Sequence, residues 1–332
     1  MGWLREAIKL ADQLRCLLVV LCSKAINVHE AISLSSDMGI RAVGVDTTSS
    51  VIGLPMFSTS ELVARTPFRR ASDASRKRNL ALVLSRLAGW ERILFLDDDI
   101  FGIDPADVRS AAGLLDQYDA VGLDNLGFPD NSVVCHFFRE IGGDQQQFVG
   151  AGGLVVSPTR TQSMFPDVYN QDWFFLIGEN RRPQVAVAGT MRQKDFDPFA
   201  NPRRARDEEF GDCLAEGLFW LLDEGLSIDD AGTEHWREFL VRRRLFIDEL
   251  IRRARRFALR GARGRRQLAS LRAAQETCAK INPSICAEYV NRWQHDVVVW
   301  RQFISDLPAR LGPRQALAEL GLPSLATPLV EG

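Results

Sequence analysis

The chain has 332 residues, of which 46% are hydrophobic and 25% are charged, as is ordinary for a folded globular protein. This length accommodates one large α/β domain with an appendage, or two domains. The net charge of −2 excludes binding to nucleic acid through overall charge, so nucleic acid is not an expected partner.

The six cysteines contain no C-x-x-C pair, which excludes a readable zinc or disulfide framework and favours a reducing compartment. The apolar run "CLLVVLC" (16–22) is far shorter than the ~20 residues of a membrane span. The start "GWLRE" (2–6) lacks the basic region and sustained apolar core of a signal peptide. We therefore expect a cytoplasmic protein.

The first 200 residues alternate apolar strands with helices. Short apolar runs predict buried strands at 15–23, 40–46, 92–96, 120–124 and 148–157. Helices are predicted at 28–38, 72–89 and 105–117, and a Ser-, Thr- and Pro-rich loop at 47–70. The alternation predicts an α/β fold with a mainly parallel sheet covered on both faces.

The 72–89 helix has Ser72 as its expected N-cap and ends at Gly89. From about residue 205 the pattern becomes helical, and aromatic residues recur at helical spacing between residues 234 and 260. We predict a catalytic domain over 1–233 and a helical C-terminal extension over 234–332.

The segment "RILFLDDDIFG" (92–102) leads an apolar strand into three carboxylates. Asp97 and Asp99 point to one side of an extended chain and Asp98 to the other. Asp46 also follows a strand, and ligands of open α/β sheets bind beyond such strand ends. Hard oxygen ligands of this kind suit Mg²⁺ or Mn²⁺. A solvated Asp-rich turn is the alternative.

The upstream helix, "SDASRKRNLAL" (72–82), carries Arg76, Lys77 and Arg78 in its first two turns. Positive charge there opposes the helix dipole, so a bound anion such as a pyrophosphate would explain it. With Leu80 central to the buried stripe, Arg76 and Lys77 project toward that stripe and Arg78 away from it. A solvated basic surface is the alternative, and it fits Arg78 best.

Together these segments resemble the nucleotide-sugar glycosyltransferases of the GT-A fold, specifically the large inverting family 2. By this resemblance Arg78 and Asn79 match the helix motif, and Asp97 and Asp99 match the metal-binding D-x-D, with Asp98 beside the donor. Asp46 is the carboxylate expected to contact the nucleobase or ribose. The resemblance implies a Rossmann-like, mainly parallel sheet, a divalent cation and a UDP- or GDP-linked sugar donor.

A third matching segment is "NQDWFFL" (170–176), where Gln171 replaces the usual Glu. Asp172 matches the general base that takes a proton from the hydroxyl of a small-molecule or glycan acceptor. Its alternative role is an N-cap or a salt-bridged helix acid. Trp173 is expected either to stack on an acceptor sugar or to lie buried.

Two further features bear on this resemblance. The stretch 185–199 lacks the histidine that often ligates the metal in this fold, so Gln193, His235 or the diphosphate itself must substitute. "VGAGGLVVS" (149–157) does not fit G-x-G-x-x-G, so Gly152 and Gly153 are expected to allow close backbone approach beside the donor or acceptor.

The segment from Arg242 to Arg266 contains many arginines and only two acids, Asp248 and Glu249. A basic helix of this kind binds anionic lipid or RNA, or packs its apolar stripe and leaves its arginines in water. An anionic acceptor, a membrane surface or a homo-oligomer contact are open roles for it.

Other functions compete with glycosyl transfer. A nucleotidyltransferase of related fold shares the metal site. In a haloacid-dehalogenase-type phosphatase Asp97 would be the nucleophile and Asp99 the acid/base, but Phe101 stands where that motif has Thr or Val. A non-catalytic protein that binds nucleotide sugar, RNA or membrane is the remaining alternative.

Overall fold

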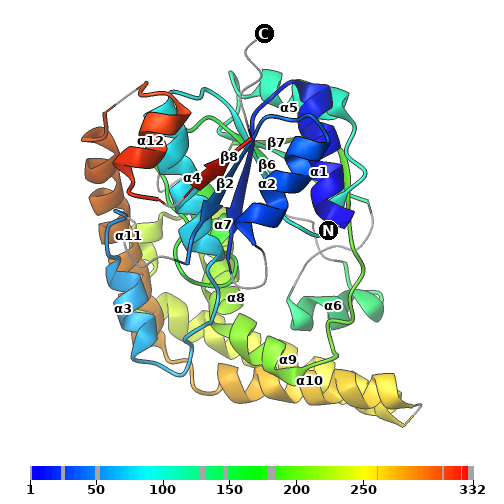
Figure 1. The fold of residues 1–332 in the computed structure, drawn as a ribbon. Helices are drawn as coiled ribbons and strands as arrows, with labels where there is room; N and C mark the ends of the chain where they lie inside the picture. The colour runs from blue at the N-terminus through cyan, green and yellow to red at the C-terminus, as the bar shows by residue number, and fades with distance from the viewer. Residues whose placement is uncertain are drawn as a thin grey trace.

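The computed structural model describes residues 2–23, 27–48, 53–126, 132–144, 149–177, 184–259, 261–308, 310–322 and 324–327. The described helices are α1 (Gly2–Leu14), α2 (Val28–Asp37), α3 (Ser58–Ala64), α4 (Ala74–Ala88), α5 (Pro105–Leu114), α6 (Val133–Glu140), α7 (Gln171–Ile177), α8 (Pro202–Asp223), α9 (Thr233–Ala258), α10 (Ala262–Cys278), α11 (Pro283–Ser305) and α12 (Pro313–Glu319). The described strands are β1 (Leu18–Cys22), β2 (Ala42–Asp46), β3 (Ile93–Leu96), β4 (Ile100–Phe101), β5 (Ala120–Asn125), β6 (Gly153–Val156), β7 (Val185–Gln193) and β8 (Ser324–Ala326). The fold is α/β with a helical C-terminal region, as expected (Figure 1).

The strands form two mixed sheets, ordered β1-β2-β8 and β3-β6-β5-β7-β4. Only the β1–β2 and β5–β7 pairs are parallel among the described pairs. The expectation of a mainly parallel sheet was therefore wrong. A buried strand is apolar whatever its direction, so periodicity does not report direction. Because β6 runs antiparallel to β5, the carboxyl end of β5 and the amino end of β6 lie at the same end of the two strands.

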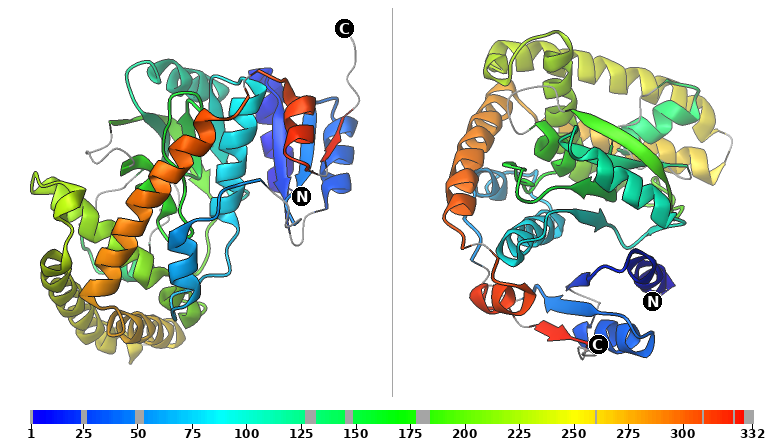
Figure 2. Two further views of the ribbon diagram at one scale, coloured as in Figure 1. Left: turned by 90° about the vertical axis from the view of Figure 1, so that its left-hand side faces the viewer. Right: turned by 90° about the horizontal axis from the view of Figure 1, so that it is seen from above.

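The larger sheet lies between the three-stranded sheet and helices α9 and α10, whereas α12 lies beside the three-stranded sheet (Figure 2). One small apolar cluster joins α1 and α2 to β1 through Leu4, Ile8, Val20 and Ala31. The main cluster runs from Val43 to Leu322 and includes side chains from α4, α7, α8, α9 and α11. The expected boundary at residue 233 thus falls between two helices, α8 and α9, that contribute to one core.

Most predicted elements of the first half are present within a few residues. The 72–89 helix is α4, although its N-cap is Asp73 and not Ser72, and Gly89 ends it in the left-handed conformation at φ 75°. Residue 148, where the last predicted strand begins, lies outside the described residues; that strand is β6.

Helix α3 contradicts the predicted loop over residues 47–70. The backbone amides of Ser58 and Thr59, at the start of α3, each donate to a carboxylate oxygen of Asp296 on α11, both at 2.8 Å. The residue that caps this helix lies 237 positions away in the sequence, so the sequence around residue 58 does not contain the residue that caps it. None of the described helices combines the length and the apolar composition needed to cross a bilayer.

Candidate functional site

The three aspartates form a turn between β3 and β4. The Asp97 amide donates to Gly152 O at 3.1 Å, which ties the start of the turn to the segment before β6. Both carboxylate oxygens of Asp97 accept from Nη2 of Arg78, each at 2.8 Å. Arg78 therefore supplies the positive charge that offsets the repulsion within the turn.

This pairing contradicts the alternative that Arg78 belongs to a solvated basic surface. Its side chain is only 13% exposed, and its guanidinium lies 5.7 Å from the ring centre of Phe165. Helix α4 is packed on more than one side and not along a single buried stripe, because Asn79 and Leu80 are both buried although they are adjacent. An arginine at this helix start can thus reach the end of β3.

Asp99 lies on the other side of the turn, next to Gln193 at the end of β7. Gln193 Nε2 donates to Asp99 Oδ2 at 2.8 Å, and the Lys194 amide donates to the Asp99 carbonyl at 2.9 Å. Partial burial raises the pKa of Asp99; the Gln193 hydrogen bond opposes this rise and the negative charge of Asp97 adds to it. Asp98 is exposed to solvent.

Asp172 lies in the first turn of α7 and contacts the same segment that holds Asp97. Its Oδ2 accepts from the Ala151 amide at 3.0 Å, and its Oδ1 accepts from the Trp173 amide at 3.1 Å. A Cβ on Gly150 would lie 3.5 Å from Asp172 Oδ2, and one on Gly152 would lie 3.5 Å from Asp97 Oδ2. The three residues from Gly150 to Gly152 thus separate the two carboxylates.

Asp46, the last residue of β2, pairs in the sheet with Cys22, the last residue of β1. Lys77 forms an ion pair with Asp73, the N-cap of its own helix, at 3.6 Å. Burial raises the pKa of the Cys22 thiol, and the positive charge of Lys77 opposes this rise. Asp46 Oδ1 accepts from the amide and hydroxyl of Thr48 at 2.9 and 2.7 Å, and these bonds lower its pKa. Arg76 is partly exposed on α4.

Three residues expected to contact the donor or acceptor are engaged within the protein. Asn79 is 2% exposed and exchanges two hydrogen bonds of 2.8 Å with the backbone of Phe165. Gly153 is a buried β6 residue whose Cβ would lie 2.4 Å from the sulfur of Met191. Trp173 packs edge-on against Phe219, with ring centres 4.8 Å apart. Asn79 and Gly153 are therefore buried beneath the site, where they would support it without contacting a ligand.

Of the two side chains considered as substitute metal ligands, only Gln193 lies beside Asp99. His235 is 3.0 Å from Gly217 O and stacks on Trp220 in the helical region. Within the described ranges, the Asp97–Asp99 turn does not gather three His, Cys, Asp or Glu ligand atoms within 4.8 Å of one another. An ion there would depend on oxygens brought by a ligand.

Two other groups with metal-ligand geometry surround a buried arginine in the helical region. They are Glu209, Cys213 and Cys278, and Cys135, Asp212 and Glu216. Arg243, only 2% exposed, donates to Glu209 at 2.9 Å, to Asp212 at 2.6 Å and to Glu216 at 2.7 Å. These carboxylates already have a cation, so we interpret the cluster as structural.

The buried cluster around Arg243 is connected to Asp172, the candidate base, by contacts with the segment just before α7. Asn170, in the left-handed conformation at φ 59°, donates to Asp212 at 3.0 Å. A Cβ on Gly211 would lie 2.3 Å from the Tyr169 carbonyl oxygen, so a glycine is needed where α8 touches this segment. Sequence reasoning missed these supports because each joins residues that are about 40 positions apart.

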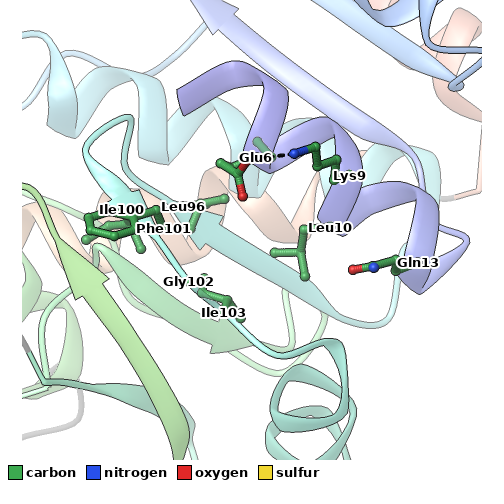
Figure 3. Close-up of a pocket in the computed structure, with 10 residues that line it drawn as sticks. Glu6, Lys9, Leu10, Gln13, Leu96, Ile100, Phe101, Gly102 and Ile103 are labelled. Atoms are coloured by element: carbon green, nitrogen blue, oxygen red, sulfur yellow. Dashed lines mark hydrogen bonds and ion pairs between the residues drawn. The ribbon is translucent and has the colours of Figure 1, made fainter. Parts of the chain in front are cut away.

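A cavity of about 150 Å³ lies between α1 and a surface formed by Leu96 at the end of β3, strand β4 and the two residues that follow it. Figure 3 shows Leu10 and Gln13 facing Leu96 and Ile103 across it, with the Glu6–Lys9 ion pair on α1. None of the predicted site residues lines it.

The fold and this geometry define an α/β protein with acidic and basic side chains gathered at strand ends. No protein-family model matches the chain, and no curated protein matches it in sequence.

Proposed function

We propose that the protein is a metal-dependent glycosyltransferase of the GT-A fold that moves a sugar from a nucleotide-diphosphate donor to an acceptor hydroxyl. One observation carries this proposal: the Gly150–Gly152 segment touches Asp97 on one side and Asp172 on the other. Sugar transfer needs a diphosphate site and a proton acceptor on opposite sides of one reacting carbon, and two carboxylates separated by a short glycine segment suit it.

The donor side would use the Asp97–Asp99 turn and the start of α4. Asp99 offers carboxylate oxygens, the donor type that Mg²⁺ and Mn²⁺ prefer, so this residue fits such an ion. Gln193 presents its amide nitrogen to Asp99 and its oxygen to Asn125 Nδ2, at 3.1 Å, so its side chain would have to turn to become a ligand. When bound, the ion would stabilise negative charge on the departing diphosphate. Arg78 brings positive charge to the end of β3, Lys77 adds positive charge at the start of α4, and Asp46 at the end of β2 offers a carboxylate to a nucleoside.

The acceptor side would use Asp172 as general base. The Ala151 and Trp173 amides each bind one of its oxygens and fix the orientation of the carboxylate. Each carboxylate oxygen has two acceptor sites, so an acceptor hydroxyl can still bind and transfer its proton. Inversion at the anomeric carbon follows from the family resemblance and belongs to this proposal.

The phosphatase alternative is disfavoured by the same contacts. A nucleophilic Asp97 would have to attack phosphorus while paired with the Arg78 guanidinium, whose positive charge stabilises the carboxylate and lowers its nucleophilicity. A nucleotidyltransferase would share the metal site, and the product of the reaction distinguishes it.

Substitutions at the two carboxylate sites test the proposal. Asp99→Ala should abolish Mn²⁺-dependent thermal stabilisation by UDP or GDP, because it removes the carboxylate proposed to hold the ion. Asp172→Asn should retain that stabilisation and lower sugar transfer by about 10²–10⁴-fold, the usual contribution of a general base. Transfer is measured by mass spectrometry with a panel of nucleotide sugars and acceptors.

Asp116→Asn is the control, because Asp116 is an acid outside the proposed site whose side chain is 76% exposed. It should change neither binding nor transfer by more than about twofold. Normal nucleotide binding by Asp99→Ala would refute the metal site, and full transfer by Asp172→Asn would remove it as the base. A product that carries the nucleotide instead of the sugar alone would identify a nucleotidyltransferase.

A further inference from the structure

Helix α9 exposes large aliphatic side chains on the face opposite its buried one. Val241 and Leu245 on the helix and Leu259, its C-cap in helical conformation, are 50%, 64% and 90% exposed, whereas Trp236 and Ile247 on the helix are fully buried. At 100° per residue, the three exposed positions fall within about 40° of one another. The helix thus has two apolar faces, and only one of them is used by the core.

Arginines surround these aliphatic side chains. Arg252, Arg255 and Arg256 lie on the same outer face, within about 100° of one another. Arg255, Arg256 and, on α10, Arg265 are exposed and have no ion-pair partner in the part of the chain that the structure describes. Arg252 pairs only with Glu249 of its own helix, among the described residues.

The positive charge is concentrated in this part of the chain. Residues 250–275 contain nine arginines and no aspartate or glutamate, and the remaining residues contain 32 basic and 43 acidic side chains. Helices α9 and α10 run along one edge of the molecule, at the bottom of Figure 1. A basic edge on an otherwise acidic protein favours an anionic partner at that edge.

We infer that this outer face of α9, with the start of α10, docks on an anionic lipid bilayer. A helix that lies in the bilayer interface places aliphatic side chains among the acyl chains and arginines at the level of the phosphates. Single-stranded nucleic acid is bound instead by stacking on aromatic side chains, and the exposed large apolar residues of this face are aliphatic. The inference does not depend on the proposed sugar transfer.

Sedimentation with vesicles tests the docking surface. The full chain should sediment with vesicles of equal parts phosphatidylcholine and phosphatidylglycerol, not with phosphatidylcholine alone, and less so at high salt. Replacing Arg255, Arg256 and Arg265 together by Gln should weaken this binding by about 100-fold, given the usual contribution of each arginine near a charged surface. Leu259→Glu should weaken it at least about tenfold.

Matched controls carry the same changes elsewhere on the surface. Arg5, Arg65 and Arg314 are exposed, and their joint replacement by Gln changes the net charge equally. Val298→Glu places a carboxylate at a residue that is 62% exposed on α11. All variants should keep the melting temperature of the wild type, and the controls should keep vesicle binding.

Failure to bind anionic vesicles, or equal losses in the control variants, would overturn the inference. So would full vesicle binding by Leu259→Glu, or tighter binding to single-stranded RNA than to vesicles, because either result would indicate a general polyanion surface. Transfer to a water-soluble acceptor should be unchanged in the α9 variants, so the two proposals fail independently.

Discussion

At the residue scale, Asn79 joins the basic start of α4 to the segment that leads to α7. Its side-chain amide uses both its oxygen and its nitrogen on the backbone of Phe165, and it follows Arg78 directly. Phe165 in turn stacks on Phe175 of α7, with ring centres 4.1 Å apart. One buried amide thus links the cationic and acidic halves of the candidate site.

Asn79→Ala should lower the free energy of unfolding by about 2–3 kcal/mol, because it leaves two buried backbone groups of Phe165 without partners. The measurement is urea denaturation followed by tryptophan fluorescence. Asn291→Ala, at an exposed position of α11, is the control and should stay within about 0.5 kcal/mol of wild type. Equal stability of the two variants would show that water replaces the lost hydrogen bonds.

The sequence predicted which side chains lie at this site, but it did not predict which residues they bind by hydrogen bonds and ion pairs. The carboxylates of Asp97, Asp99 and Asp172 belong to one connected region, but the Arg78–Asp97 pair and the Gln193–Asp99 hydrogen bond were not expected. Helical periodicity indicates one buried stripe, and it cannot show that a second face of α4 packs against a loop 86 residues away.

At the element scale, α8 is unusual because it buries four acids near one face. Glu208, Glu209 and Asp212 are each less than 5% exposed, and Glu216 is partly buried. Glu209 and Asp212 bind Arg243 of α9, and Glu208 binds Arg204 of its own helix. The basic pattern of α9 could not reveal that one arginine of the run faces inward.

Arg243→Met should destabilise the protein by about 3–5 kcal/mol, because it leaves several carboxylates buried without a cation. The loss should appear in urea denaturation at neutral pH. Arg255→Met, on the outer face of the same helix, tests the loss of an exposed arginine and should cost less than about 0.5 kcal/mol. A small effect of Arg243→Met would mean that the acids of α8 are largely protonated.

Glu208 should make stability depend on pH in the direction opposite to that of an ordinary surface acid. Burial raises its pKa from 4.5 to about 7, against the opposing charge of Arg204. Between these pH values the folded state holds more protons than the unfolded state, so stability is greatest below about pH 4.5 for this group and falls as the pH rises toward 7. Burial raises the pKa of Glu216 to about 7 as well, with the same sign.

The melting temperature should therefore fall as the pH is raised from about 5 to about 8, with a contribution from Glu208 of up to about 3 kcal/mol. Glu208→Gln should flatten this slope, because glutamine does not titrate. Glu276→Gln, at a side chain that is 60% exposed, should leave the slope unchanged. A slope that survives Glu208→Gln would assign the effect to Glu216 or to another group.

At the scale of the whole molecule, the C-terminal helices complete the core of the α/β part. Phe174 of α7 contacts Trp293 of α11 with ring centres 5.2 Å apart, and Phe210 of α8 contacts Tyr289 at 5.7 Å. Strand β8 pairs with β2 across more than 270 residues of sequence. Local patterns predicted the helical character of this region, but they carry no information on what its apolar faces cover.

The fragment 1–233 should therefore not fold by itself, although the sequence pattern changes at that point. Without α11, the amides and hydroxyls of Ser58 and Thr59 lose the carboxylate of Asp296, which is only 1% exposed, and Phe174 loses its aromatic neighbours. We expect the fragment to show no cooperative thermal transition by circular dichroism, whereas the full chain shows a single one.

The control is the fragment 1–233 mixed with a separately produced 234–332, which should regain cooperativity if the two parts associate. A cooperative transition in 1–233 alone would establish residue 233 as a true domain boundary, and the shared aromatic contacts would then be an interface between two independently stable units.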